Sequence, residues 1–406
     1  MPALPRWLCL GLLPLAALSD AIAYYACRMM LPVHLLDRGG DTEDIVAATS
    51  AMGVASLVGT LLAGLASIAT GPFALAPLGA LGLAASGALL ALAPAELAAF
   101  PAVFLGASHG VLRTALLGGA ARAFPDLRTE HARNAAFFAL YGVSNLGAVA
   151  IRGWAREADP TVSFLGGAGF GGLAFLATLG LAIAVWVTRE QKDALTEPPA
   201  REGHAHLWVA GASLVVGALV WALWPYAFEA VFDLVRASEG SFREHAALID
   251  ANPIVVTLVC TVALAVALGL HALKVRPFSV IPLGVGLLLV SAGGVALLRA
   301  EAVSDSVVWP AVVVVSLGEA IAAPLVLSRL AGDLPKWAPT LAIAAFYVVS
   351  GAPSVLLRLV APDLELTVAL GAPGAAAAGL AGLAALVAGL LLLRVPRPDP
   401  ARPAEF

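Results

Sequence analysis

Charged side chains are scarce in this chain. They make up 12% of its 406 residues, against about 25% in soluble domains. Aromatic residues reach only 7%, and there is no basic tract or aromatic platform suited to nucleic acid. A net charge of −4 gives no reason to expect a polyanionic partner. Apolar residues make up 60%, with a mean hydropathy of +0.92. The composition therefore predicts an integral membrane protein whose partner is the lipid bilayer.

The chain also lacks the residue patterns of metal-binding proteins, disulfide-bonded proteins and enzymes. The three cysteines, Cys9, Cys27 and Cys260, fall in apolar segments at spacings that fit neither a metal site nor a disulfide framework, so we interpret them as buried thiols. The histidines are scattered, and no nucleophile lies at a suitable spacing from a base. No glycine-rich phosphate loop occurs, which argues against ATP-driven transport. We therefore predict no cofactor, no metal and no enzyme, and a membrane enzyme or non-transporting sensor is the minor alternative.

Apolar stretches recur along the whole chain, each of about the 20 residues that a helix needs to cross a bilayer. The first continues past Asp20 and Arg28 to Leu36, which is too long for a secretory signal peptide. Twelve spans are predicted, at 7–36, 44–69, 73–94, 98–124, 130–155, 163–188, 206–232, 246–273, 277–298, 304–331, 337–360 and 371–394.

A polar connection after the sixth span divides the chain. We expect an N-terminal six-helix bundle at 1–188, a cytoplasmic linker at 189–205, a C-terminal six-helix bundle at 206–394 and a cytoplasmic tail at 395–406. Lys and Arg favour cytoplasmic loops, and fourteen lie in the loops on the N-terminal side against seven on the other. Both termini are therefore predicted to be cytoplasmic. We expect a multi-pass monomer in a cell membrane, specifically a bacterial inner membrane.

Six plus six helices joined by a central linker predict the all-α major facilitator fold, in which the substrate site lies near the midplane between two helical bundles. Asp20, Arg28, Arg113 and Glu319 lie deep in apolar segments, where each costs roughly 2.5–3.5 kcal/mol on insertion scales. They fall in spans 1, 4 and 10, which begin three of the four expected three-helix repeats. We predict that these side chains converge on one polar cavity that forms a solute pathway.

The first span carries a polar stripe. Asp20, Tyr24 and Arg28 follow one another at intervals of four residues on one helix face, with Tyr25 beside them. A carboxylate, a phenol and a guanidinium in line can bind a zwitterion or relay a proton. The alternative is a structural Asp–Arg pair that only holds helices together.

The fourth span carries His109 and Arg113, again four residues apart. Arg113 stays protonated, so it is predicted to neutralise Asp20 or to grip a substrate carboxylate through paired hydrogen bonds. His109 either takes part in proton movement or is a hydrogen-bonded packing residue.

Polar residues in three further spans complete the candidate site. In the fifth span, Tyr141 and Asn145 are four residues apart, and an interhelical hydrogen bond is the alternative role for Asn145. In the eighth span, Asp250 lies near the predicted outer end, where solvation explains it, and Asn252 follows. Glu319 has apolar sequence on both sides, so it is a candidate amine site or proton site, with a structural role as the alternative.

Five segments resemble motifs of the proton-coupled oligopeptide transporter (POT/PTR) family of major facilitators. They occur in the family's order and in the corresponding spans. The segments are ALSDAIAYYACR at 17–28 against E-x-x-E-R-F-x-Y-Y-G-x-R, GVLRT at 110–114 against G-L-x-K-P, LYGVSNLG at 140–147 against F-Y-x-x-I-N-x-G, IDANP at 249–253 against Q-S-x-N-P, and GEAIAAPLVLS at 318–328 against G-E-L-x-x-x-P-x-G-L-S. Phe346 and Tyr347 are similar to the Trp-Phe pair that follows in the family.

The resemblance implies proton-coupled symport of small peptides by alternating access. Arg28 would hold the peptide carboxylate, Glu319 the amine, and nearby phenols and amides the peptide backbone. The substrate-binding residues predicted on these grounds are Tyr24, Tyr25, Arg28, Arg113, Tyr141, Asn145, Asn252 and Glu319. The predicted proton-coupling residues are Asp20, Arg113 and Glu319.

The chain also departs from the family pattern. The first glutamate of the span 1 motif is Ala17, its arginine is Ala21, and its second glutamate is shortened to Asp20. In span 7 the chain has Pro225 near the usual glutamate position, with Glu229 one helical turn further on. These losses, together with eight tryptophans, keep open a second hypothesis: an uncoupled or exporting carrier of amphiphilic metabolites or drugs.

Overall fold

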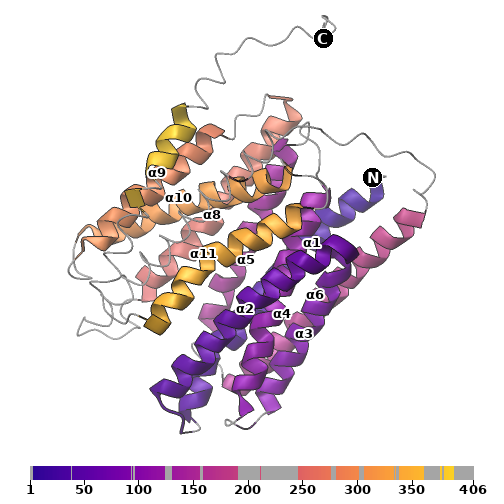
Figure 1. Cartoon of the computed structure of the whole chain (residues 1–406), viewed down its shortest axis with the longest axis vertical. Coiled ribbons are helices and arrows are strands. Elements are labelled where there is room, and N and C mark those ends of the chain that lie inside the picture. The colour runs from indigo at the N-terminus through magenta and orange to yellow at the C-terminus, as the bar shows by residue number, and fades with distance from the viewer. Residues whose placement is uncertain are drawn as a thin grey trace, which may run out of the picture.

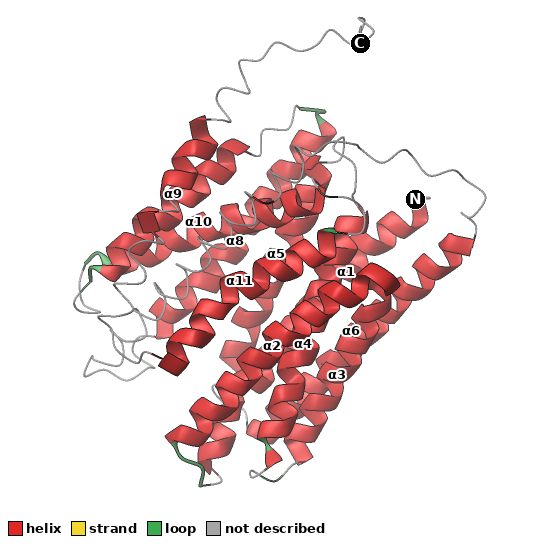
Figure 2. Cartoon of the chain, viewed as in Figure 1, coloured by secondary structure: helices red, strands yellow, loops and turns green. Residues whose placement is uncertain are grey.

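The structure is a computed structural model that describes residues 3–37, 39–92, 94, 97–123, 130–155, 159–190, 211, 246–275, 280–300, 306–332, 334, 338–360, 375–376 and 379–387. These residues are helical or lie in short turns, and no strand occurs among them (Figure 2). The helices are α1 (Ala3–Asp37), α2 (Thr42–Thr70), α3 (Pro72–Leu92), α4 (Ala99–Ala123), α5 (Glu130–Ala155), α6 (Pro160–Glu190), α8 (Ala246–Ala272), α9 (Val280–Leu298), α10 (Val308–Gly332) and α11 (Pro339–Val360).

The helix bounds agree closely with the predicted spans. α5 has the predicted bounds, and every other labelled helix begins and ends within four residues of its prediction. Eight of the described helices are long and apolar enough to cross a membrane. The prediction of an all-helical polytopic membrane protein is therefore confirmed.

Parts of the prediction fall outside the described residues. The span at 206–232 lies there except for Gly211, as do the tail at 395–406 and the linker at 189–205 apart from the two residues that end α6. Of the span at 371–394, residues 375–376 and 379–387 are described, and they are helical. The count of twelve helices and the division into two six-helix bundles therefore stay predictions.

The turns around α2 show how local sequence sets helix ends. The Asp41 side chain accepts a hydrogen bond from the Asp44 backbone N–H, and the Asp44 carboxylate accepts one from the Asp41 N–H. This reciprocal capping satisfies two backbone donors at the start of the helix. At the other end Gly71 adopts a φ of 83°, which favours glycine, and Pro72 follows as the first residue of α3.

The helices form a layered bundle in which sequence-distant elements lie side by side (Figure 1). The most extensive contacts among the first six helices join α3 to α6, α2 to α4 and α1 to α6, whereas α10 packs on α9 and α8. Two further pairs, α5 with α8 and α2 with α11, connect these groups. The two ends of the bundle are named from the predicted topology. The inner end is the one at which α1, α5 and α11 begin and α4 and α10 end. The outer end is the opposite one.

Glycines allow α2 and α4 to approach closely. Gly106 and Gly110 form a G-x-x-x-G pattern in α4, and a Cβ atom on either would overlap backbone oxygens of α2, those of Met52 and Ser56. Small residues at this spacing are typical of membrane helix contacts. The contact fixes the rotation of α4 and therefore the direction in which His109 points.

We expect Gly110→Ala to lower the free energy of unfolding by about 1–3 kcal/mol, because the added methyl group overpacks a rigid backbone contact. The matched control is Gly169→Ala in α6, where a Cβ atom meets nothing within 4 Å. Melting temperatures of both variants in detergent provide the measurement. If both variants melted alike, the α2–α4 contact would not be as rigid as the structure indicates.

Candidate functional site

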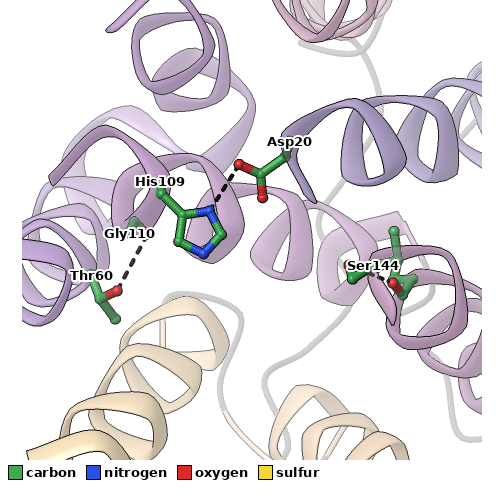
Figure 3. Close-up of polar contacts among 6 residues, drawn as sticks. Asp20, Thr60, His109, Gly110 and Ser144 are labelled. Carbon is green, nitrogen blue, oxygen red and sulfur yellow. Dashed lines mark hydrogen bonds and ion pairs between the residues drawn. The ribbon is translucent and has the colours of Figure 1, made fainter. Parts of the chain in front are cut away.

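Asp20 and His109 form a buried pair at the middle of α1 and α4. The Nδ1 atom of His109 lies 2.9 Å from the Oδ1 atom of Asp20 (Figure 3). The two residues are only 3% and 7% exposed. The Tyr24 ring stacks on the His109 ring, with 3.9 Å between centroids and 10° between planes. The histidine is thus held in orientation by a carboxylate on one ring atom and by an aromatic face.

This pairing corrects the sequence-based expectation that Asp20 faces Arg113. The guanidinium carbon of Arg113 instead lies 3.9 Å from the centre of the Tyr347 ring on α11. His109 and Arg113 are about 6 Å apart along the axis of α4. Of the two, His109 is the residue that lies at the depth of Asp20. The Nε atom of Arg113 is buried and has no hydrogen-bond partner among the described residues. Arg113 therefore contacts α11 through Tyr347 and does not contact Asp20 on α1 among the described residues.

A second buried carboxylate, that of Glu319 on α10, lies in a separate hydrogen-bond network. Its Oε1 atom accepts a hydrogen bond of 2.5 Å from the Tyr141 hydroxyl, and its Oε2 atom accepts one of 2.8 Å from the Asn252 amide. Asn252 also lies 3.0 Å from the Ser316 hydroxyl. Glu319 is 4% exposed. Both oxygens of the buried carboxylate therefore have partners, and these come from α5 and α8.

The remaining predicted residues lie around the first pair or make local bonds. Tyr25 contacts Tyr24 edge to face, at 5.5 Å between centroids, and the Arg28 guanidinium lies 5.8 Å from the Tyr24 ring centre. The amide of Asn145 donates to the carbonyl oxygen of Tyr141 in its own helix. This bond lies within α5, and no interhelical hydrogen bond of Asn145 occurs among the described residues.

The predicted convergence of all four ionisable residues on one chamber is seen only in part. No described contact joins Asp20 directly to Arg113 or to Glu319. Tyr347 contacts Arg113. Among the described residues, Asp20 with His109 and Glu319 with Tyr141 and Asn252 therefore form two separate polar clusters.

A cavity of about 390 Å³ lies between α1, α2 and α11. Arg28 and Tyr24 line it from α1. Because Arg28 lies eight residues beyond Asp20, the cavity is displaced by about 12 Å along the helix axis towards the outer end. Its further lining residues are Met29, Pro32, Thr49, Ser50, Met52, Gly53, Ser56, Leu57 and Gly351.

At the inner end, α5 and α10 make a polar contact that the sequence analysis missed. Arg133 is 1% exposed, and its Nε atom donates to the Ser328 hydroxyl, which in turn donates to Asn134. A side chain at Gly332 would overlap the Arg133 guanidinium. Arg133 is one of the fourteen Lys and Arg residues that the sequence assigns to the cytoplasmic side, and only its position in the fifth predicted span indicates burial.

Charge pairs lie at both ends of α5. At the inner end, Glu130 lies 3.7 Å from Arg329 on α10. At the outer end, Arg152 lies 2.5 Å from Asp250 on α8, so Asp250 is paired, where the sequence suggested solvation alone. Side chains of the outer pair are 22% exposed, and such partly solvated pairs contribute less than about 1 kcal/mol. They define how the helices meet more than they stabilise the bundle.

The cysteines and the metal-ligand residues complete the inventory of reactive groups. Cys9, Cys27 and Cys260 are free and buried, as predicted. Across the described ranges, no three His, Cys, Asp or Glu side chains gather in a group that could hold a metal ion.

Comparisons with known proteins give similar structures but no sequence relative. No family model and no curated protein sequence matches the chain. A crystal structure of the human organic anion transporter MFSD10 (TETRAN) is similar with a TM-score of 0.68 and 15% identity, over 97% of this chain and 100% of that one. Structures of a POT family transporter, in complex with a thioalcohol-conjugated peptide and with 5-aminolevulinic acid, give TM-scores of 0.61 and 0.60 at 16% identity, each over 95% of both chains.

At these identities the likeness shows the fold alone. The similar structures are those of transporters. Together with the eight helices that are able to cross a membrane, they lead to one conclusion. The chain is a multi-pass helical membrane protein that shares its fold with these transporters.

Proposed function

We propose that the chain is a secondary transporter that moves small peptides or similar zwitterionic solutes by alternating access, coupled to protons. The observation that carries this proposal is the pair of buried carboxylates, Asp20 and Glu319, at the middle of two apolar helices. Ionisable groups at such a depth are costly, and in membrane proteins they mark pathways for ions or substrates. Their placement on α1 and α10 matches a midplane site between two groups of helices.

Substrate recognition follows from charge. Arg28 borders the cavity and Arg113 has a buried Nε atom without a hydrogen-bond partner among the described residues, so both are suited to a substrate carboxylate. Glu319 is the acid for a substrate amine, which would replace Tyr141 or Asn252 as its partner. Tyr24, Tyr25 and Asn145 would contact the substrate backbone. The POT family transporters bound to a peptide and to 5-aminolevulinic acid support this substrate class.

Alternating access requires contacts that break at each end in turn. The inner contact of Arg133 with Ser328 and the outer pair of Arg152 with Asp250 both join α5 to helices of the second half. Proton coupling would act on the Asp20–His109 pair, since one added proton changes the charge of a buried pair by a full unit. Arg113 and Glu319 would respond through the substrate that they bind.

A second candidate function is an uncoupled carrier of amphiphilic anions. The cavity between α1, α2 and α11 favours it, because one cation and several apolar side chains line that cavity. The similar fold of the human organic anion transporter gives further support.

Uptake into proteoliposomes tests the proposal. The purified full-length chain is reconstituted, and accumulation of a labelled dipeptide is measured with and without an inward proton gradient. We expect several-fold more dipeptide than in protein-free liposomes, and an increase when the gradient is imposed. Uptake of an amphiphilic anion that ignores the gradient, without dipeptide uptake, would favour the second candidate. Absence of uptake for every solute would contradict both.

A further inference from the structure

Arg113 and Tyr347 form a contact between α4 and α11. The guanidinium carbon of Arg113 lies over the Tyr347 ring, 3.9 Å from its centre, which is well within the limit of about 6 Å for a cation–π interaction. An N–H group aimed at the ring would hold this carbon atom farther away. The guanidinium therefore contacts the ring through its flat face, the stacked arrangement that arginine adopts on aromatic side chains.

The packing of α4 against α11 brings the two residues to one level. The helices run in opposite directions, since α4 ends and α11 begins at the inner end. They approach closely at Gly118, where a Cβ atom would lie 2.5 Å from the Oγ1 atom of Thr340. From this contact towards the outer end, Arg113 lies about 7.5 Å away along α4 and Tyr347 about 10.5 Å away along α11. The long arginine side chain spans the difference.

The Tyr347 ring is held by its own surroundings. Phe346, which is 1% exposed, packs edge to face on it, with 5.4 Å between centroids and 80° between planes. The Tyr347 side chain is partly buried and packs against the hydrophobic core. An aromatic side chain in close-packed surroundings has few alternative rotamers, so Tyr347 presents a fixed surface to Arg113.

The stack does not use the hydrogen-bond donors of Arg113. The N–H groups of a guanidinium lie in its plane and point outward from its edge. The Nε atom is buried and has no hydrogen-bond partner in the described part of the chain, and buried polar atoms are rarely left in that condition. The ring lies on the face, whereas a carboxylate binds at the edge. Tyr347 therefore holds Arg113 without competing with an anionic ligand.

An acidic partner would act differently, because it would occupy the donors that a ligand needs. The acid expected to do so, Asp20, pairs with His109 instead. A long side chain that is held by neither an acid nor a ring samples many rotamers, and fixing it on binding costs free energy. The aromatic contact lowers this cost, because the guanidinium is already oriented when the ligand arrives.

We infer that Tyr347 is a positioning residue for Arg113: its ring holds the face of the guanidinium and leaves the edge ready for a substrate carboxylate. Tyr347 therefore sets how strongly the site prefers a solute with a carboxylate over the same solute without one, although it does not touch the carboxylate. The ring performs this role, and the hydroxyl group is not required. The inference rests on the proposed function, in which Arg113 binds the substrate carboxylate, and extends it to a residue of α11.

Two probes that differ only at the carboxylate test this role. They are L-alanyl-L-phenylalanine and its C-terminal amide, which both carry the amine. Binding of each to the full chain in detergent is measured by calorimetry and by thermal stabilisation. We expect the unmodified chain to bind the dipeptide at least about tenfold more tightly than the amide, because only the dipeptide pairs with the edge of a guanidinium.

Variants of Tyr347 separate the ring from the hydroxyl group. Tyr347→Leu should weaken dipeptide binding at least about fivefold and change amide binding less than about twofold, because it removes only the support of the carboxylate contact. Tyr347→Phe should restore dipeptide binding, since it keeps the ring face. If Tyr347→Leu does not fold, Tyr347→Met takes its place, because methionine adapts to the space that it fills. Val349→Ala is the matched control, an exposed position on the same helix.

A double-mutant cycle shows whether Tyr347 acts through Arg113. Arg113→Gln alone should weaken dipeptide binding at least about tenfold, since it removes a charge-assisted pair. Tyr347→Leu added to Arg113→Gln should then weaken it no further, because residues that act through one contact are not additive. A purely structural effect of Tyr347 would persist in the Arg113→Gln background.

Three results would overturn the inference and leave the proposed function intact, provided that the unmodified chain binds and takes up the dipeptide. One is an equal loss of dipeptide and amide binding in Tyr347→Leu, or in Tyr347→Met if it is used. Another is dipeptide binding by Tyr347→Phe that is as weak as that by Tyr347→Leu. The third is full additivity of the Tyr347 and Arg113 variants. Absence of both binding and uptake in the unmodified chain would instead reject the proposed function, and this inference with it.

Discussion

Glu319→Gln is expected to reduce solute uptake at least about tenfold, which corresponds to a loss of 1.4 kcal/mol or more of interaction free energy. The carboxylate accepts hydrogen bonds from Tyr141 on α5 and Asn252 on α8. A glutamine can accept with one atom only, so one buried donor loses its partner, at a cost of about 1–3 kcal/mol. The variant also removes the negative charge that would hold a substrate amine. Uptake by proteoliposomes and melting temperature in detergent measure the two effects separately.

Ser316→Ala is the matched control for this prediction. Ser316 lies beside the network and contacts Asn252, but it does not touch the carboxylate. Its replacement should leave uptake close to that of the unmodified chain. If Glu319→Gln lowered only the melting temperature and kept full uptake, Glu319 would have a structural role, the alternative that the sequence left open.

Asp20→Asn and His109→Gln are each expected to abolish the stimulation of uptake by a proton gradient, while exchange of labelled for unlabelled solute continues. The two residues lie 2.9 Å apart and are almost fully buried. Under the proposed function they hold the coupling proton together, so loss of either residue removes its site. A neutral amide at either position can still make a hydrogen bond but cannot change charge. Uptake at equal and at unequal pH across the vesicle membrane, combined with counterflow, provides the measurement.

Thr60→Val is the control beside this pair. The Thr60 hydroxyl lies 3.4 Å from the carbonyl oxygen of Gly110, next to His109, and Figure 3 shows it on the side of the histidine away from Asp20. Valine has nearly the same shape, so the packing of α2 on α4 is kept and the gradient response should persist. A gradient response that survives His109→Gln but not Asp20→Asn would show that the histidine is a packing residue, as the sequence also allowed.

The candidate site was partly predictable from sequence. Hydropathy located Asp20, Arg113 and Glu319 inside apolar helices. The separation of four residues placed His109 and Arg113 on one face of α4. Spacing along one helix does not reveal which neighbouring helix each residue faces. For that reason Arg113 was expected beside Asp20, whereas it lies against Tyr347 on α11.

Residues at the helix ends show the same limit. Arg133 and Asp250 lie near ends of predicted spans, where solvation is the simplest expectation. In the structure α5 meets α10 at the inner end and α8 at the outer end, so Arg133 is buried against Ser328 and Asp250 pairs with Arg152. These partners come from segments that are far apart in the chain.

The sequence by itself determined that this protein is built of membrane-crossing helices, where the described helices begin and end, and which ionisable residues lie at their middle. Those properties depend on local composition, since a helix in lipid satisfies its own backbone hydrogen bonds. Only the tertiary structure decided which ionisable residues pair, and where the cavity beside Arg28 lies. Pairing depends on the rotation and tilt of each helix, and close packing of neighbours sets these, as at Gly106 and Gly110 against α2.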